Sequence, residues 1–313
     1  MESSEIKIFS GLSNVPLAEK IVRKLDIPLG AIEIKRFSDG EIWVKYGENI
    51  RGSDVYIVQS TNPPSDNILE LLILIDAAKR ASARRITAVI PYFGYSRQDR
   101  KDQPRVSITA KLIANLITTA GADRVMTMDL HASQIQGFFD IPLDHLYGSS
   151  IFTGLFNDIS DDLVVVSPDV GGIKIARAYA KKLHASLVLI DKRRPKPNLA
   201  EVVKIIGSVD GKDVLLVDDL IDTGGTFVVA IDALKKQGAR RIFGAITHPV
   251  FSGDAIKRIQ ESELEKLYVS DTIYLAGKSD KIKVISASAM FAEAIRRTSN
   301  NESISSLFEI DKG

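Results

Sequence analysis

The stretch Val214-Leu-Leu-Val-Asp-Asp-Leu-Ile-Asp-Thr-Gly-Gly-Thr226 joins a short apolar run, adjacent carboxylates, paired glycines and the start of a helical pattern. Residues 214–217 suit a parallel strand that is covered on both faces. The acids then follow at its carboxyl end, where open α/β sheets bind ligands. Gly224 and Gly225 tolerate positive φ and close backbone approach. With the helix N-terminus that begins near Thr226, this turn predicts a phosphate site.

Electrostatics indicates what the two acids contact. Like charges about 4 Å apart repel by roughly 4 kcal/mol at an effective dielectric near 20, whereas a helix N-terminus returns only about 0.3–1 kcal/mol per anion. Asp218 and Asp219 are therefore expected to face sugar hydroxyls or a metal ion, while the turn Asp222-Thr223-Gly224-Gly225-Thr226 takes the phosphate. This pattern predicts a site for a phosphorylated sugar. The alternative is a hydrophobic strand followed by an ordinary Asp-Gly turn.

Composition limits the classes of protein to consider. A chain of 313 residues predicts about two domains. The 41 basic and 40 acidic residues nearly balance, which argues against a general nucleic-acid surface. The absence of cysteine excludes disulfides, thiolate metal sites and cysteine nucleophiles. No signal-peptide pattern opens the sequence and no apolar run reaches about 18 residues. We therefore expect a cytoplasmic protein with neither nucleic acid nor membrane as a partner.

Strand-like and helical segments alternate along the chain. The strand-like segments are residues 6–9, 55–59, 86–90, 125–129, 164–167, 187–190, 214–217 and 242–247, and helical patterns include residues 68–81, 108–120, 173–183 and 227–237. Such alternation predicts an α/β protein with mainly parallel sheets. Residues 120–131 also echo residues 237–248, because each follows a helical pattern and enters a strand that ends in histidine. The echo predicts two duplicated domains with a boundary near residues 146–150.

Other polar clusters also follow strand-like segments. Asp129 and His131, two apart on a strand, are expected to share a face and to bind a divalent metal. The spacing by itself equally fits a buried histidine with one hydrogen bond. Asp169 follows another strand and precedes two glycines. Residues 97–102 form a dense polar loop that also fits a solvated charge run. Residues 192–198 are basic and rich in proline, which fits either a flap over the site or a solvated linker.

Taken together, these motifs resemble those of ribose-phosphate diphosphokinases, also called phosphoribosyl diphosphate synthetases. The turn at residues 222–226 is similar to the ribose-phosphate loop that this family shares with phosphoribosyltransferases. Five further motifs occur in the family order: Arg36-Phe-Ser-Asp-Gly-Glu41, Tyr95-Ser-Arg-Gln-Asp-Arg-Lys-Asp102, Met128-Asp-Leu-His-Ala-Ser-Gln-Ile-Gln-Gly-Phe-Phe-Asp140, Ser167-Pro-Asp-Val-Gly-Gly172 and Asp191-Lys-Arg-Arg-Pro-Lys-Pro-Asn198. They span nearly the whole chain, and six motifs in order are far more specific than one.

The resemblance implies two phosphoribosyltransferase-like (Rossmann-like) domains. Residues 1–148, with a final helix near 290–313, would contribute to ATP binding, and residues 149–289 would bind ribose 5-phosphate. The resemblance implies ATP contacts from Phe37, Asp39, Glu41, Arg97, Gln98, Asp102 and His131. It implies catalytic roles for Lys192 and Arg194, and metal contacts from His131, Asp169 and Asp129. One departure is Ile175, where many relatives carry arginine.

The implied reaction is transfer of the β,γ-diphosphoryl group of ATP to the C1 hydroxyl of ribose 5-phosphate. Its products would be AMP and 5-phosphoribosyl 1-diphosphate, which feeds nucleotide, histidine and tryptophan synthesis. The family uses Mg²⁺, with two ions expected, and its members form homohexamers built from dimers that inorganic phosphate activates. An aromatic flag at residues 36–41 would then reach a neighbouring subunit. Two alternatives stay open, namely a phosphoribosyltransferase and a catalytically silent regulatory homologue.

Overall fold

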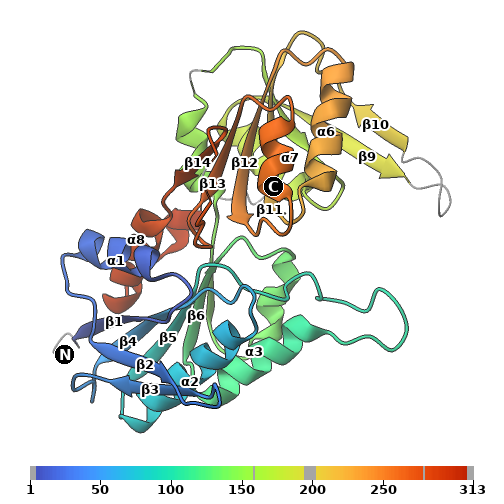
Figure 1. Ribbon diagram of the computed structural model, residues 1–313. Coiled ribbons are helices and arrows are strands. Elements are labelled where there is room, and N and C mark those ends of the chain that lie inside the picture. Colours follow the sequence, from blue (N-terminus) through green and yellow to red (C-terminus); the bar gives the residue numbers. More distant parts are fainter. Residues whose placement is uncertain (1–4, 158, 194–201, 278, 309–313) are drawn as a thin grey trace. The chain divides into compact units, whose positions relative to one another are not determined.

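A computed structural model of the chain describes residues 5–157, 159–193, 202–277 and 279–308. The described chain divides into two compact units, whose elements are labelled in Figure 1. Among the described residues, unit 1 contains the chain up to Tyr147, the short segment Thr272–Tyr274, and the chain from Ser286 to Phe308. Unit 2 contains the remaining described residues. Unit 1 is therefore discontinuous in sequence, because the chain returns to it after unit 2.

Unit 1 is built on a parallel sheet of five strands in the order β1-β4-β5-β6-β7. These strands are β1 Ile6–Ser10, β4 Asp54–Val58, β5 Arg85–Ile90, β6 Arg124–Met128 and β7 Leu143–Leu146, and an antiparallel hairpin is formed by β2 Ile32–Arg36 and β3 Ile42–Tyr46. The helices are α1 Val15–Leu25, α2 Asp66–Arg80, α3 Thr109–Ala120 and α8 Ser288–Ser299, with 3-10 turns at η1 Ser133–Phe138 and η3 Ser305–Phe308.

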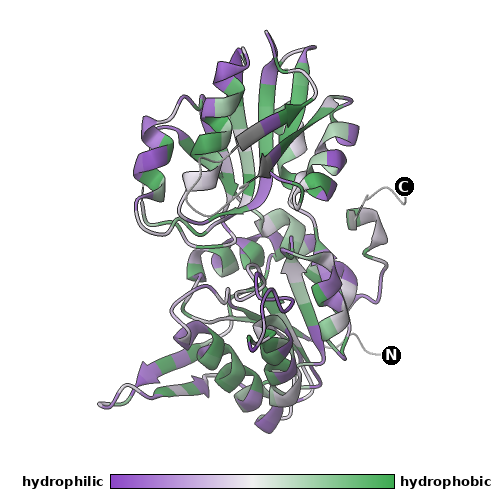
Figure 2. Ribbon diagram, turned by 90° about the vertical axis from the view of Figure 1, so that its right-hand side faces the viewer, coloured by the Kyte–Doolittle hydropathy of each residue, from purple (hydrophilic) through white to green (hydrophobic). Residues whose placement is uncertain are grey.

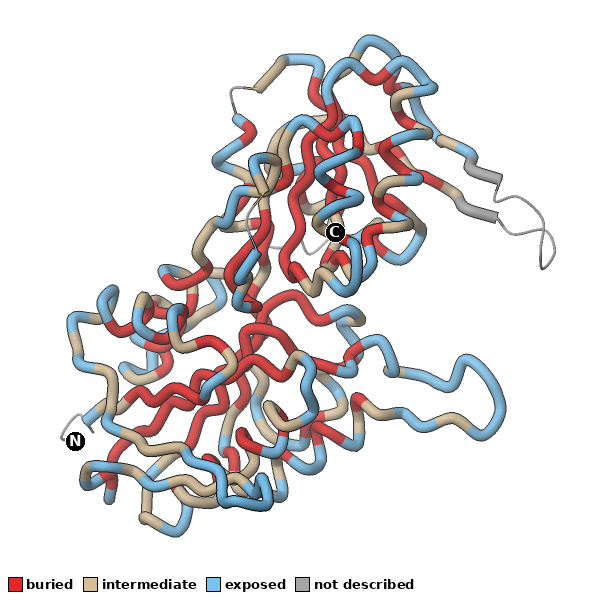
Figure 3. The backbone as a smooth tube through the Cα atoms, in the orientation of Figure 1, coloured by how far each residue is buried: buried red, intermediate tan, exposed pale blue. Residues whose placement is uncertain are grey.

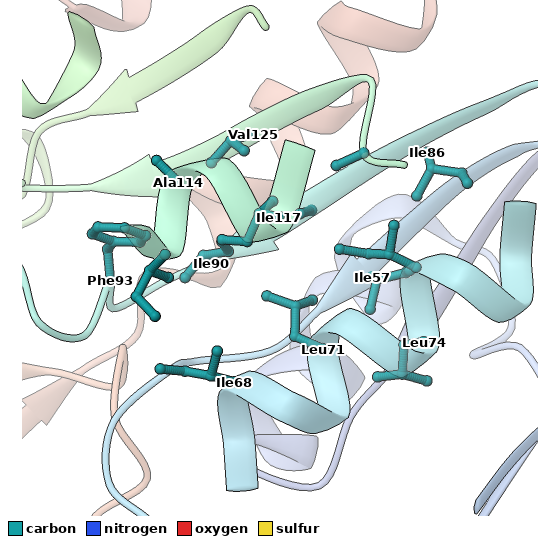
Figure 4. Close-up of a cluster of buried hydrophobic side chains, with 14 of the residues drawn as sticks. Ile57, Ile68, Leu71, Leu74, Ile86, Ile90, Phe93, Ala114, Ile117 and Val125 are labelled. Atoms are coloured by element: carbon teal, nitrogen blue, oxygen red, sulfur yellow. The ribbon is translucent and has the colours of Figure 1, made fainter. Parts of the chain in front are cut away.

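The two faces of this sheet bury alternate residues of each strand, as a pleated strand requires. On β4, Val55 and Ile57 join the cluster that α2 and α3 cover, part of which Figure 4 shows in close-up. Tyr56 points to the other face, where its hydroxyl lies 3.2 Å from the hydroxyl of Thr298 on α8. Helix α8 packs beside α1 on that face (Figure 1). The last helix of the chain thus completes the core of unit 1.

Unit 2 has a sheet of seven strands in the order β10-β9-β8-β11-β12-β13-β14, parallel except for the edge strand β10. Its strands are β8 Leu163–Ser167, β9 Ser186–Arg193, β10 Val202–Ile206, β11 Asp213–Ile221, β12 Arg241–Pro249, β13 Lys266–Ser270 and β14 Ile282–Ile285. The helices are α4 Ser149–Phe152, α5 Ile173–Lys182, α6 Gly225–Lys236 and α7 Ala255–Glu261, with a 3-10 turn at η2 Thr153–Leu155.

The central strand β11 is buried on both sides, as its apolar run predicts. Val214 and Leu216 pack into the cluster under α6 and α7, while Leu215 and Val217 pack into the cluster under α4 and α5. Ile175 on α5 packs against the second of these clusters. Hydrophobic residues accordingly follow the strands in Figure 2, and Figure 3 shows those strands as buried. The expected α/β class with mainly parallel sheets is confirmed.

The two units repeat one topology. In each, a first strand is followed by a two-stranded hairpin and then by four parallel strands in sequential order, so β1-β4-β5-β6-β7 matches β8-β11-β12-β13-β14. An ion pair marks the repeat. The buried carboxylate of Asp54 on β4 binds Arg84 and Arg85, and the buried carboxylate of Asp213 on β11 binds Arg240 and Arg241.

The duplication has a different register from the sequence echo. Residues 120–131 contain β6 and residues 237–248 contain most of β12, which are the fourth and third strands of their repeats. The echo arises because both helices end next to a positive-φ glycine, Gly121 (119°) and Gly238 (86°). A left-handed glycine followed by a buried alanine suits any short helix-to-strand turn. The two echoing segments therefore do not occupy equivalent places in the repeat, whereas Asp54 and Asp213 with their arginines do.

No described helix is both long enough and apolar enough to cross a membrane.

Candidate active site

The acids Asp218 and Asp219 lie inside β11 rather than after it. β11 pairs with β8 only as far as Leu216, but it pairs with β12 as far as Ile221. The expectation that the strand ends before the acids is wrong, because β12 is equally long and continues the pairing at Asp218, Leu220 and Ile221. Both acids still lie beyond the end of the β8 pairing. That position places them beside the loop that follows β8.

The loop after β8 converges on these acids. Within it, the Ser167 hydroxyl donates to the Asp169 carbonyl at 2.7 Å, and the Gly172 N–H donates to Asp169 Oδ1 at 3.0 Å. A Cβ atom built on Gly172 would lie 2.9 Å from Ser167 Oγ, 3.4 Å from Asp218 Oδ1 and 3.9 Å from Asp169 Oδ1. Gly172 therefore lets two carboxylates from separate elements approach one another. The sequence motif contained this glycine, but its contact with Asp218 depends on the sheet order.

The acids form an electrostatically strained group. Burial raises the pKa of Asp218 well above its ordinary value, and the neighbouring charges of Asp219 and Asp169 raise it further. The Asp219 N–H, which donates to Asp218 Oδ1 at 2.9 Å, offsets a small part of that effect. A hydroxyl donor or a cation placed here would stabilise the charged form of Asp218. The group has the chemistry of a site for a diol or a hard metal ion.

The turn at residues 222–226 has the geometry of an anion site. Gly224 adopts φ of +75°, and α6 begins at Gly225. Outside atoms brace the turn, since the Ser252 N–H donates to the Asp222 carbonyl at 3.0 Å and Arg258 donates to the Thr223 carbonyl at 3.2 Å. The positive end of the α6 dipole points at this turn. The bracing by Ser252 and Arg258 was not predicted, because both lie far along the sequence.

In unit 1, the position that corresponds to Asp218 of unit 2 is filled by side chains of unit 1 itself. By the register of the repeat, Gln59 after β4 stands where Asp218 stands on β11. Its side chain is fully buried, accepts from the Ser13 N–H at 3.0 Å and donates to Glu70 at 2.8 Å. Glu70 in turn accepts from the Leu12 N–H at 2.7 Å. The duplicated edge of unit 1 is therefore closed by internal hydrogen bonds.

The segment expected to bind metal in unit 1 is not extended. β6 ends at Met128, and Asp129 follows with φ of +35°, outside the strand region. Contrary to the expectation, Asp129 and His131 therefore do not share a strand face. Asp129 is buried and His131 is exposed. Within the described residues, no group of three or more histidine, aspartate or glutamate side chains is arranged to hold a metal ion.

Residues 97–102, in the loop between β5 and α3, are largely exposed (Figure 3). Arg97, Gln98 and Asp102 all have exposed side chains on it. Gln98 is also tied to the start of α3, because Thr109 donates to its Oε1 at 2.5 Å and the Ala110 N–H donates to its carbonyl at 3.2 Å. Gln98 therefore anchors the loop.

The aromatic flag is the tip of the β2-β3 hairpin. The Phe37 N–H donates to the Glu41 carbonyl at 2.9 Å, and Asp39 accepts from the Glu41 N–H at 3.1 Å. Arg36 pairs with Asp66 on α2 at 2.8 Å and thereby ties the hairpin to the unit. The Phe37 side chain is 55% exposed.

The basic segment is described only in part. Lys192 lies near the end of β9, but its side chain is outside the described part of the structure. Arg194 lies outside the described residues altogether.

The fold defines a class, namely duplicated α/β proteins with mainly parallel sheets, and the edge of unit 2 offers a candidate site for a phosphorylated ligand. Two family descriptions match the chain: the N-terminal domain of ribose phosphate pyrophosphokinase at residues 6–121, and the phosphoribosyl synthetase-associated domain at residues 191–309.

Full-length relatives agree with these descriptions. The chain is 59% identical to a ribose-phosphate pyrophosphokinase of Chlorobaculum tepidum over 97% of this chain and 95% of that protein. It is 54% identical to one of Rhizobium meliloti over 97% of this chain and all of that protein. A crystal structure of phosphoribosylpyrophosphate synthetase from Mycobacterium smegmatis aligns with a TM-score of 0.90 and 38% identity, covering 95% of this chain and all of that one. The chain belongs to the ribose-phosphate pyrophosphokinase family.

Proposed function

We propose that this chain converts ATP and ribose 5-phosphate into AMP and 5-phosphoribosyl 1-diphosphate. The single observation that carries the proposal is 59% identity over nearly the whole chain to a relative named for that activity. In the reaction, the C1 hydroxyl oxygen forms a bond to the β-phosphorus of ATP. The bond from that phosphorus to the oxygen bridging the α-phosphorus breaks, and the hydroxyl proton is lost to solvent. The protein's task is to align the two substrates and to offset charge.

Unit 2 would hold ribose 5-phosphate. The backbone of residues 222–226 would bind the phosphate at the start of α6, as helix N-termini do. Asp218 and Asp219 would accept hydrogen bonds from the ribose hydroxyls. This assignment is supported by the raised pKa of Asp218, because a bound hydroxyl donor stabilises its charged form.

Unit 1 would contribute the ATP contacts. Phe37, Asp39 and Glu41 lie on the hairpin tip, and Arg97, Gln98 and Asp102 lie on the exposed loop after β5. Phe37 supports this assignment best, since its ring is held out at 55% exposure and can stack on a base. His131 would meet the phosphates. Gln98 would act partly through its backbone, because Thr109 engages its side chain.

The residues also fit a magnesium requirement. Mg²⁺ prefers carboxylate oxygens, keeps several waters, and is commonly held by one or two carboxylates together with substrate phosphates. Asp169 offers such oxygens, and we propose it as a ligand with Asp129 and His131 as further candidates. When bound, the metal would neutralise phosphate charge. Two ions are proposed, and a titration of activity with Mg²⁺ against fixed ATP tests the number.

Lys192 and Arg194 would stabilise the negative charge on the transferring group. The position of Lys192 near the end of β9 supports this role, because β9 lies next to β8, whose loop meets the acids. The double variant Lys192→Ala with Arg194→Ala is expected to lower kcat by several orders of magnitude through the lost charge stabilisation. An unchanged kcat would remove both residues from the mechanism.

We further propose a homohexamer built from dimers, activated by inorganic phosphate and working in the cytoplasm. The exposed Phe37 supports contact with a neighbouring subunit. Light scattering tests the assembly, and activity measured against free phosphate tests the activation.

The decisive test is an assay of AMP formation with each substrate omitted in turn. AMP that appears only when both ATP and ribose 5-phosphate are present supports the proposal. Consumption of 5-phosphoribosyl 1-diphosphate together with a nucleobase would indicate a phosphoribosyltransferase instead. No turnover, combined with activation of an active relative on mixing, would indicate a silent regulatory homologue.

A further inference from the structure

The turn that follows β6 carries an unusual backbone. Asp129 has φ of +35°, a left-handed conformation that is unfavourable for a residue with a side chain. Such a conformation persists when neighbouring contacts hold it in place. The turn leads directly to His131, which is exposed two residues later.

Two hydrogen bonds from β7 hold this turn on either side of the strained residue. The Asp129 N–H donates to the Leu146 carbonyl at 3.0 Å, which extends the β6-β7 ladder by one position. The next N–H, that of Leu130, donates to Nε2 of His145 at 2.9 Å. Leu130 and His145 are both buried, at 5% and 6% exposure. The first bond is made by backbone and any residue supplies it, whereas the second depends on one side chain.

The imidazole of His145 is held in the orientation that this bond needs. Because Nε2 accepts the Leu130 N–H, the ring proton lies on Nδ1. The ring packs against Tyr147 with a centroid distance of 4.4 Å. On the preceding residue, Asp144 binds Arg124 of β6 through two contacts of 2.8 Å. The backbone around His145 is therefore held on the sheet, and packing against Tyr147 limits the directions that its ring can take.

We propose that His145 is a positioning residue for the nucleotide-binding segment Asp129-Leu-His131. By accepting the Leu130 N–H, it holds the left-handed turn at Asp129, and that turn sets the direction in which His131 leaves the sheet. His145 acts through the backbone of Leu130. The inference rests on the proposed function, because it assigns the segment to ATP.

The test compares two substitutions at one position. His145→Gln keeps a side-chain acceptor within reach of Leu130, and His145→Leu fills a similar volume without one. KM for ATP is expected to rise about tenfold or more in H145L, which corresponds to about 1.4 kcal/mol. KM for ribose 5-phosphate is expected to stay within about twofold, because its proposed site lies in the other unit. In H145Q both constants are expected to stay near the wild-type values.

A second measurement follows the hydrogen bond itself. Hydrogen exchange of a peptide containing Leu130 is expected to be faster in H145L than in the wild type, and to remain slow in H145Q. H145L with an unchanged KM for ATP would overturn the proposal, as would H145Q impaired as strongly as H145L. Equal increases of both KM values in H145L would also overturn it, by showing a general loss of structure. A wild-type protein that forms no AMP would refute the proposed function. A wild-type protein that forms AMP, with H145L unchanged in its KM for ATP, would refute only the role of His145.

Discussion

Gly172 offers the sharpest test of the sugar-phosphate site. Its backbone has φ of −77°, so alanine adopts the same conformation without strain. The added Cβ, however, would lie 2.9 Å from Ser167 Oγ and 3.4 Å from Asp218 Oδ1. The first distance is too short by about half an ångström for a carbon and an oxygen in contact. Gly172→Ala therefore acts as a wedge between the loop after β8 and the acid group.

The size of the effect follows from the cost of overpacking. An inserted methyl group in a well-packed site costs about 1–3 kcal/mol. If that cost falls on ribose 5-phosphate binding, its KM rises between about 5-fold and 150-fold. KM for ATP is expected to change less than KM for ribose 5-phosphate, because the side chains proposed to contact ATP directly lie in unit 1. Initial rates of AMP formation, with each substrate varied in turn, give both constants.

The matched control is Gly154→Ala, also in unit 2. A Cβ atom at Gly154 meets nothing within 4 Å, so the same chemical change is made without a wedge. Thermal unfolding of both variants separates a local effect from a loss of stability. A KM for ribose 5-phosphate in G172A that matches the value in G154A would refute the assignment of the acid group to the sugar.

Three further predictions follow from the same structure. Asp213→Asn is expected to lower Tm by about 6–12 °C, because breaking a buried ion pair whose arginines are half-exposed costs about 3 kcal/mol. The exposed Asp232→Asn serves as the control, and a Tm that is insensitive to Asp213→Asn would contradict the prediction. The arginines lower the pKa of Asp213, so the stability that this ion pair contributes is present above about pH 4 and is lost as pH falls through the pKa of Asp213 in the folded protein. Burial and the charge of Asp219 raise the pKa of Asp218, so affinity for ribose 5-phosphate is expected to fall as pH drops through that pKa. Asp219→Asn is expected to move the midpoint of this fall in affinity to lower pH. Calorimetric titration at several pH values tests this, and an unchanged midpoint would exclude the effect of Asp219 on Asp218. Phe37→Ala is expected to raise KM for ATP about tenfold through the lost stacking on the base. Little change in Tm is expected, because the ring is 55% exposed in the isolated chain. A wild-type KM for ATP in initial-rate measurements on this variant would remove Phe37 from the ATP site.

Local signals in the sequence were sufficient for the elements and the class of fold. The apolar run at residues 214–217 predicted a strand buried on both faces, and its alternate side chains do pack into separate clusters. The extension of β11 to Ile221 was not predictable in this way, because it depends on pairing with the long β12. Element type is set by neighbours along the chain, whereas strand length is set by a partner far away.

The same division holds at the candidate site. The glycine turn at residues 222–226 could be read from the sequence, because positive φ at Gly224 is a local property. The left-handed backbone of Asp129 could not, since contacts with β7 hold it. The closure of unit 1 by Gln59 and Glu70 was also hidden, because recognising it requires the register of the repeat. Long-range pairing decides these features.

Helix α8 has a consequence for the order in which the chain is built. It packs against α1, and the carbonyl of Thr298 accepts from Arg85 at 3.4 Å, yet the ribosome makes these residues after all of unit 2. In the nascent chain, the face of unit 1 around α1 therefore stays uncovered until α8 has been synthesised. A stop codon placed after Ile285 would remove α8 and would leave the first-made unit unfinished.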